Sequence, residues 1–365
     1  MVNARKRLTP YTRVWIAVIV LWLTGCATVQ RPSGQVGTVP PPTPTAGTIP
    51  PPTATLSGTQ AGVYDNPIFP GDFPDPFVLA ADDGYYAYST NVGDTNVPVV
   101  RLSEDFATYE PLGDALPQLP LWAGWHQSLT WAPAVLLRGE QYVLYYTARY
   151  RAEGRQCLSR AVSDTPAGPF TDDSSEPFIC QLDLGGSIDP SPFVDEEGTP
   201  YLLWKNDGNC CGRPVGLWVQ ELSEDGLSLA GEPVELIRRD QLWESPLIEA
   251  PAMVEHDDQY YLFYSGNWWE SHTYAVGYAV CETVTGPCVK PQREPIFQFN
   301  QQAMGPGGEE FFRDDEGNLW MVYHAWTAPV VGYPEGERSL RIEPVTFVDG
   351  KPTIPGPTID PQALP

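Results

Sequence analysis

Residues 75–88 read DPFVLAADDGYYAY, in which a short apolar run, a polar turn and an aromatic run follow one another. The pattern recurs four more times along the chain. Its copies begin at Asp75, Ala132, Asp189, Glu249 and Gly308, so the successive intervals are 57, 57, 60 and 59 residues. Repeats of this length, made of short aromatic and β-branched strands, are typical of propeller blades. We therefore predict an all-β fold, a five-bladed β-propeller that forms one domain over residues 62–365.

The composition argues against nucleic acid as a partner. The 365 residues include 46 Asp and Glu against 21 Lys and Arg, which gives a formal net charge of -25. Nucleic-acid binding needs a basic surface, so no nucleic-acid partner is expected. Runs of acidic residues recur at the turn that follows the first strand of four repeats: Asp82-Asp83, 195–197, Asp257-Asp258 and 314–316. We interpret these runs as solvated exterior of the propeller.

The first 61 residues have the features of an export signal and a tether. Residues 1–25 begin with basic side chains and continue into the apolar run Val14–Leu23, which is shorter than the roughly 20 residues that span a membrane. Leu23-Thr24-Gly25-Cys26 resembles a bacterial lipobox, which implies lipid attachment at Cys26; an ordinary secretory signal is the alternative. Residues 26–61 form a Pro/Thr-rich linker. We expect an exported protein, lipid-anchored at the bacterial surface or the periplasmic face.

Export explains the use of cysteine. Six cysteines remain when Cys26 is assigned to the lipid, and an even number in an oxidising compartment favours disulfides. We expect two local pairs, Cys157 with Cys180 and Cys281 with Cys288. Cys210 and Cys211 form either a vicinal disulfide or pairs elsewhere. A zinc site is the alternative, but the sequence contains no CxxC motif and only four histidines.

Three of the five repeats begin with a carboxylic acid: Asp75, Asp189 and Glu249. In a propeller the first strands line the central channel, so these residues would surround one mouth. A structural alternative exists, because Asp before Pro often caps a turn. Crowded carboxylates raise one another's pKa and indicate chemistry instead. Inverting glycoside hydrolysis uses such a set, with one protonated acid and one ionised base on either side of a water molecule.

The motifs at these positions resemble those of family 43 glycoside hydrolases over residues 64–350 and in all five repeats. They are PGDFPDP at 70–76, WAP at 131–133, SIDPS at 187–191 and IEAP at 248–251. The resemblance implies an inverting glycosidase. Asp75 would be the general base that activates water, Glu249 the general acid, and Asp189 the group that orients the acid and adjusts its pKa.

The resemblance also implies a substrate class, namely arabinose- or xylose-containing plant glycans. We favour an exo-acting α-L-arabinofuranosidase or β-xylosidase. The alternatives are an endo-arabinanase on the same fold and a non-catalytic glycan-binding surface lipoprotein. We expect a monomer whose only membrane contact is the lipid anchor.

Aromatic and polar residues near the predicted mouth are candidates for sugar binding. Because sugar C–H faces stack on indole rings, Trp131 and Trp268 are the expected platforms. Asn206 and His324 follow returning strands and are expected to contact hydroxyl groups. No cofactor is required. Many family members carry a channel ion near a His after Gly-Pro-Gly, but here Gly308 and Glu309 follow Gly305-Pro306-Gly307, which puts a calcium or sodium ion in doubt.

Overall fold

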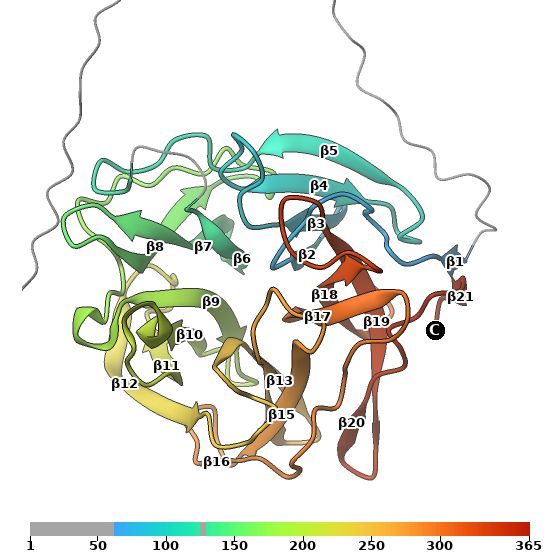
Figure 1. Cartoon of the computed structure of the whole chain (residues 1–365). Helices are drawn as coiled ribbons and strands as arrows, with labels where there is room; N and C mark the ends of the chain where they lie inside the picture. Colours follow the sequence, from blue (N-terminus) through green and yellow to red (C-terminus); the bar gives the residue numbers. More distant parts are fainter. Residues whose placement is uncertain (1–61, 125–128) are drawn as a thin grey trace, which may run out of the picture. The chain divides into compact units, whose positions relative to one another are not determined.

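A computed structural model describes residues 62–124 and 129–365. The expected signal peptide (1–25), the lipid-attachment residue Cys26 and the linker (26–61) lie outside the described residues. Five antiparallel sheets are arranged around a central axis (Figure 1), as the repeat predicts. In the described part of the chain, no helix is long and apolar enough to cross a membrane.

Each sheet is formed by consecutive strands and constitutes one blade. Blades 1 and 2 contain β2 (Phe77–Ala81), β3 (Gly84–Tyr88), β4 (Pro98–Leu102) and β5 (Tyr109–Asp114), then β6 (Trp131–Arg138), β7 (Gln141–Tyr150) and β8 (Arg155–Ser163). Blade 3 contains β9 (Ser187–Val194), β10 (Pro200–Asn206), β11 (Gly216–Leu222) and β12 (Leu229–Arg238). Two short 3₁₀ helices, η1 (Leu182–Leu184) and η2 (Gly208–Cys211), flank β9 and β10.

The last two blades complete the ring. They contain β13 (Ile248–His256), β14 (Gln259–Gly266), β15 (Ala275–Cys281) and β16 (Cys288–Val289), then β17 (Ala303–Arg313), β18 (Leu319–Thr327), β19 (Arg338–Val348) and β20 (Lys351–Thr353). The first strands β2, β6, β9, β13 and β17 contact one another in that order, and β17 contacts β2. The predicted acidic runs all lie in hairpin turns between first and second strands.

The two ends of the described chain meet. Strand β1 (Val63–Tyr64) pairs with β21 (Gln362–Ala363), and Phe69 forms an isolated bridge to Leu340 of β19. The segment between β1 and β2 therefore lies along the last blade, and Asn66 reinforces it by hydrogen bonding both backbone groups of Ile342. Within the described residues, side-by-side packing of the first and last blades closes the ring, and no strand is exchanged between them.

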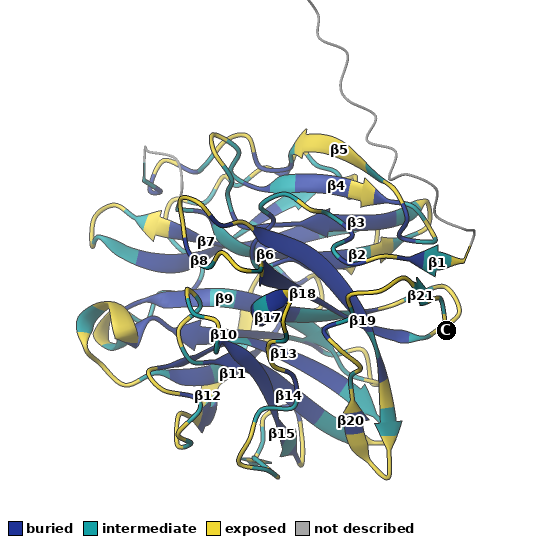
Figure 2. Ribbon diagram, turned by 45° about the vertical axis from the view of Figure 1, so that its right-hand side comes forward, coloured by how far each residue is buried: buried dark blue, intermediate teal, exposed yellow. Residues whose placement is uncertain are grey.

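Apolar side chains fill the spaces between neighbouring blades. Five buried clusters, one for each interface, hold aromatic and branched residues such as Tyr88, Trp204, Trp320 and Tyr323. Figure 2 shows that the inner strands are largely buried, whereas the outer strands β5 and β20 are largely exposed. Since each interface joins two blades, burial of these side chains stabilises the ring as a whole.

Every blade has a residue with positive φ in its first strand or, in blade 1, two residues before that strand. These residues are Asp75, Ala132, Asp189, Ala250 and Gly308, with φ of 50, 43, 57, 51 and 60°. In four blades the pairing with the second strand shifts register there, as in a β-bulge. The sequence spacing placed Glu249 in this set, which is wrong by one residue: Ala250 occupies the position, and Glu249 is equivalent to Trp131 and Ile188.

A ring of side chains in the second strands, or just after the second strand in blade 1, holds these positive-φ residues. Thr90, Thr147, Ser265 and His324 each accept a hydrogen bond from the backbone N–H of the next blade's positive-φ residue, at 2.8, 3.3, 2.9 and 3.1 Å. The equivalent residue in blade 3 is Lys205, whose ammonium group can donate hydrogen bonds but cannot accept one. The N–H of Ala250 instead donates to Asp189 Oδ2 at 3.1 Å, and Lys205 turns to Glu249. This exception places a buried cation beside two carboxyl groups.

Candidate active site

A pocket of about 610 Å³ opens at the end of the axis where the first strands begin. All five blades contribute to its wall. Its lining contains an unusual number of carboxyl groups: Asp72, Asp75, Asp189, Asp207, Glu249, Glu309 and Glu310. The three predicted catalytic acids are therefore brought together in one enclosed space.

Asp75 is held as a carboxylate. Arg338 Nη1 lies 3.2 Å from Asp75 Oδ1, and the Thr90 hydroxyl donates to Oδ2 at 2.6 Å. Burial alone would raise the pKa of Asp75, but the Arg338 guanidinium and the Thr90 hydrogen bond lower it, so the pKa is below its usual value. An ionised carboxylate in a pocket is a suitable general base.

His324 lies behind Asp75 and not in the pocket wall. Its Nδ1 accepts the Asp75 N–H, and burial, aided by Arg338, lowers the His324 pKa to about 3. The ring is thus neutral at pH 7 and carries its proton on Nε2, so the ring contributes no positive charge to Asp75. We conclude that Arg338 and Thr90 keep this carboxylate ionised.

Asp189 and Glu249 form a second, coupled group. Lys205, which is fully buried, contacts Glu249 Oε2 at 2.8 Å, and the Tyr274 hydroxyl donates to Oε1 at 2.9 Å. Burial and the neighbouring charge of Glu249 raise the pKa of Asp189 to about 8, although Lys205 opposes the shift. The pair therefore retains a proton near neutral pH, while Asp75 does not. This separation of pKa values is the pattern that assigns acid and base roles to carboxyl groups.

The predicted sugar-binding residues differ in their placement. Trp131 and Trp268 both line the pocket, and Trp268 is 41% exposed. Asn206 is buried outside the pocket lining, where its carboxamide bonds the carbonyl groups of Leu184 and Pro214 and the N–H of Gly216. The structure therefore corrects two expectations: Asn206 supports a loop, and His324 holds a bulge.

Sequence reasoning missed Arg338 and its neighbours. Arg338 begins β19, and its guanidinium lies 4.7 Å from the centre of the Trp269 ring. The Arg338 Nε donates to the Tyr333 hydroxyl at 3.2 Å, and that hydroxyl contacts both carboxylate oxygens of Asp72 at 2.9 Å. Tyr333, Asp72 and Trp269 also line the pocket. A single Arg at a strand start, 263 residues from Asp75, carries no local signal of this contact.

Two further carboxyl groups form part of the pocket lining. Burial raises the pKa of Glu310 to about 8 and that of Glu309 well above its usual value. Ser265 donates to Glu309 Oε2 at 2.5 Å. Both shifts favour the neutral form of the carboxyl group, so they limit the negative charge in the pocket.

The residues near the axis do not fit a channel ion held by His324. Its Nδ1 is occupied by the Asp75 N–H, and Nε2 carries a proton and would act as a donor rather than a metal ligand. Among the residues that the structure describes, no group of three or more His, Cys, Asp or Glu side chains is arranged to hold a metal ion.

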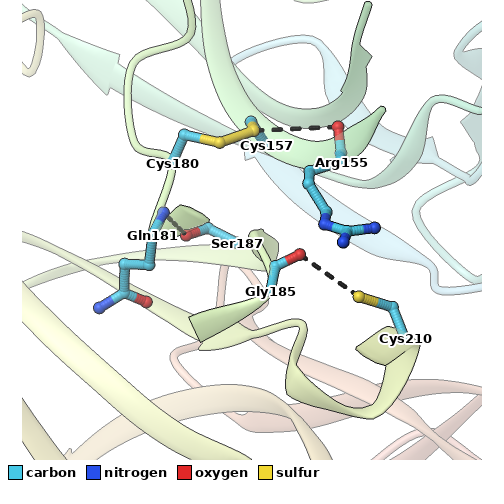
Figure 3. The surroundings of a disulfide bond; sticks show 7 residues. All are labelled: Arg155, Cys157, Cys180, Gln181, Gly185, Ser187 and Cys210. Carbon is cyan, nitrogen blue, oxygen red and sulfur yellow. Dashed lines mark hydrogen bonds between the residues drawn. A yellow bond between two sulfur atoms is a disulfide. The ribbon is translucent and has the colours of Figure 1, made fainter. Parts of the chain in front are cut away.

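The six cysteines of the described chain are paired as Cys157–Cys180, Cys210–Cys211 and Cys281–Cys288. The last bond joins the opposed residues of β15 and β16. Cys157–Cys180 connects β8 to the segment that precedes η1 (Figure 3), and Cys210 lines the pocket.

A five-bladed propeller whose central pocket holds an ionised carboxylate together with a proton-retaining carboxyl pair has the base and acid groups that a glycoside hydrolase needs. The particular family follows from comparison with known proteins. Residues 64–352 match the model of glycosyl hydrolases family 43. The chain belongs to this family.

Several relatives resemble the chain over most of its length. It is 26% identical to a beta-D-galactofuranosidase of Aspergillus niger, over 74% of this chain and 78% of that protein. It is 27% identical to a xylosidase/arabinosidase of Butyrivibrio fibrisolvens, over 80% of this chain and 56% of that protein. A thermostable family-43 glycoside hydrolase has a similar structure, with a TM-score of 0.74 and 31% identity over 82% of this chain and 98% of that chain.

The contact between Arg338 and Asp75 leads to a pH prediction. In Arg338→Gln, burial is no longer opposed by the guanidinium, so the pKa of Asp75 should rise. The base must be ionised to act, so the acidic limb of the kcat/KM profile should move to higher pH, by about 1–3 units. Arg313→Gln is the matched control, because Arg313 is the last residue of β17 and lies away from the pocket. An unchanged acidic limb in Arg338→Gln would show that Arg338 does not control Asp75.

Proposed function

We propose that the protein is an inverting glycosidase that releases terminal α-L-arabinofuranosyl or β-xylosyl units from plant glycans. The observation that carries the proposal is the contrast between Asp75, held ionised by Arg338 and Thr90, and the Asp189–Glu249 pair, which retains a proton. The xylosidase/arabinosidase relative supports the pentose substrate.

In this mechanism Asp75 removes a proton from a water molecule as the water oxygen attacks the anomeric carbon. The bond from that carbon to the leaving oxygen breaks on the opposite face, and Glu249 donates a proton to the leaving oxygen. Asp189 and Lys205 set the charge around Glu249, and Tyr274 fixes its orientation. Trp131 and Trp268 offer apolar faces for the sugar rings. The anomeric configuration is inverted because only one displacement occurs.

An endo-arabinanase is the second candidate. The chain is 24% identical to a probable arabinan endo-1,5-alpha-L-arabinosidase of Aspergillus flavus, over 77% of this chain and 90% of that protein. Product sizing distinguishes the two: an exo enzyme releases monosaccharide from the first time point, whereas an endo enzyme first shortens the polymer.

The decisive experiment is hydrolysis of a glycoside panel by the purified protein. The panel contains α-L-arabinofuranosides, β-xylosides, β-D-galactofuranosides, arabinan and arabinoxylan, with the first product followed by NMR. We expect pentose release with inverted configuration. Initial retention would refute the mechanism, and activity confined to galactofuranosides would refute the pentose assignment.

We propose also that residues 1–25 are removed on export, that Cys26 is lipidated and that residues 26–61 tether a monomeric enzyme. The basic and apolar parts of the signal and the LTGC motif support this localisation. Labelled palmitate should enter the wild type in a bacterial host, and Cys26→Ser should abolish labelling. Labelling of the Cys26→Ser variant would contradict the anchor.

A further inference from the structure

One wall of the pocket is formed by a loop with an unusual covalent structure. Cys210 and Cys211, adjacent in sequence, are joined by a disulfide at the end of η2. Cys210 is exposed and lines the pocket together with Asp207 and Asn209. A bond between neighbouring cysteines closes a small ring that includes their peptide bond, so it presents two sulfur atoms on a stiff backbone. The ring has an apolar, polarisable surface and no N–H or O–H donor on its sulfur atoms.

The base of this loop is fixed by hydrogen bonds. Asn206 donates to the carbonyl groups of Leu184 and Pro214, at 3.1 and 2.9 Å, and accepts the N–H of Gly216 at 2.7 Å. The N–H of Arg213 donates to the Gly208 carbonyl at 2.8 Å, which closes the turn. The loop therefore holds Cys210 in a defined position.

A second disulfide supports the loop from behind. Cys210 Sγ lies 3.4 Å from the carbonyl oxygen of Gly185, as Figure 3 shows. The Asp207 N–H donates to the Gly186 carbonyl at 3.0 Å, and a Cβ atom at Gly185 would overlap the Asp207 carbonyl. This turn begins next to Cys180, which is bonded to Cys157 of β8. Two of the three disulfides thus stiffen the same side of the pocket.

The loop lies on the side of the proposed general acid. It continues directly from Lys205, whose ammonium contacts Glu249, and the Asp207 carboxyl interacts electrostatically with both. Asp207 is buried, yet no hydrogen bond within the described residues occupies its carboxylate oxygens. A group that leaves from the anomeric carbon takes its proton from Glu249 and therefore departs toward this loop.

We propose that the Cys210–Cys211 disulfide, with Asp207 and Asn209, forms the subsite that binds the leaving-group sugar. The Cys210 sulfur contacts the C–H face of that sugar, and the Asp207 carboxyl and Asn209 carboxamide groups bind its hydroxyls. The subsite rests on the proposed glycosidase function. It selects substrates whose leaving group is a sugar ring over those with a small leaving group.

The test compares two substrates in the full-length protein. A pentose oligosaccharide needs the leaving-group subsite, whereas the corresponding pentosyl fluoride, whose leaving group is a single atom, does not. In Cys210→Ser/Cys211→Ser we expect KM for the oligosaccharide to rise about tenfold, which corresponds to about 1.4 kcal/mol of binding. The kcat for the oligosaccharide and kcat/KM for the fluoride should change little. Asn209→Ala, which leaves the disulfide intact, should also raise KM for the oligosaccharide.

Cys281→Ser/Cys288→Ser, which removes a disulfide outside the pocket, is the matched control and should leave both substrates unaffected. Thermal unfolding establishes that each variant is folded. Equal losses of kcat/KM on both substrates would overturn the subsite. An unchanged KM for the oligosaccharide in both pocket variants would also overturn it. Failure of the wild type on both substrates would instead overturn the glycosidase function on which the subsite rests.

Discussion

Glu249→Gln should lower kcat/KM on pentosides with a poor leaving group by roughly 10²–10⁴-fold, the usual contribution of a general acid. Gln keeps the size of the side chain and can still bond Tyr274, but it has no proton to donate to the leaving oxygen. The loss should shrink for a dinitrophenyl pentoside, whose leaving group departs as a stable anion. The measurement is therefore kcat/KM across a series of leaving groups of decreasing pKa.

Glu255→Gln is the control for this variant, because Glu255 lies in the same strand, β13, at the end away from the pocket. Its kcat/KM should match the wild type for every leaving group. A Glu249→Gln loss that is the same for all leaving groups would mean that Glu249 binds or positions the substrate and does not protonate it.

Asp75→Asn should lower kcat/KM by a similar roughly 10²–10⁴-fold, but with no dependence on the leaving group. The carboxamide cannot accept the proton of the attacking water, whereas protonation of the leaving oxygen is unaffected. Since the substitution also removes the negative charge that faces Arg338, substrate binding should be measured separately with a non-hydrolysed thio-glycoside.

Asp72→Asn is the matched control, because Asp72 lines the same pocket but contacts Tyr333 and the backbone of Arg338 rather than bonding Thr90. It should lose much less activity. A small effect of Asp75→Asn, with wild-type binding of the thio-glycoside, would require a different base.

Most of the fold could be predicted from the sequence because each blade repeats the same local pattern. Short aromatic strands and acidic turns recur at a nearly constant interval, and the number of recurrences gives the number of blades. By side-chain type the sequence repeat aligns Glu249 with Asp75 and Asp189, one residue before the equivalent backbone position at Ala250. The structure aligns the blades on backbone conformation, and the positive-φ position accepts Asp, Ala or Gly alike.

The candidate site was only partly predictable. Asp75, Asp189 and Glu249 carry local motifs, so the sequence suggests them. Arg338 and Tyr274 reach the acids from distant segments, and their local sequence has no distinguishing pattern. The position of His324 is not predictable from the sequence, because its fully buried ring accepts the Asp75 N–H of the next blade and does not face the pocket. Such contacts depend on how neighbouring blades pack against one another. The spacing of the sequence repeats contains no information about that packing.

The pairing of β1 with β21 has a consequence for how the enzyme could be rearranged. Since Val63 lies opposite Ala363, a short covalent link could join the two ends of the propeller. Every blade is contiguous in sequence, so the ring could be opened at another hairpin that lies away from the pocket, such as Asp257–Asp258, and one chain would still carry every pocket residue. The catalytic geometry thus depends on the closed ring of blades and does not depend on where in that ring the chain begins.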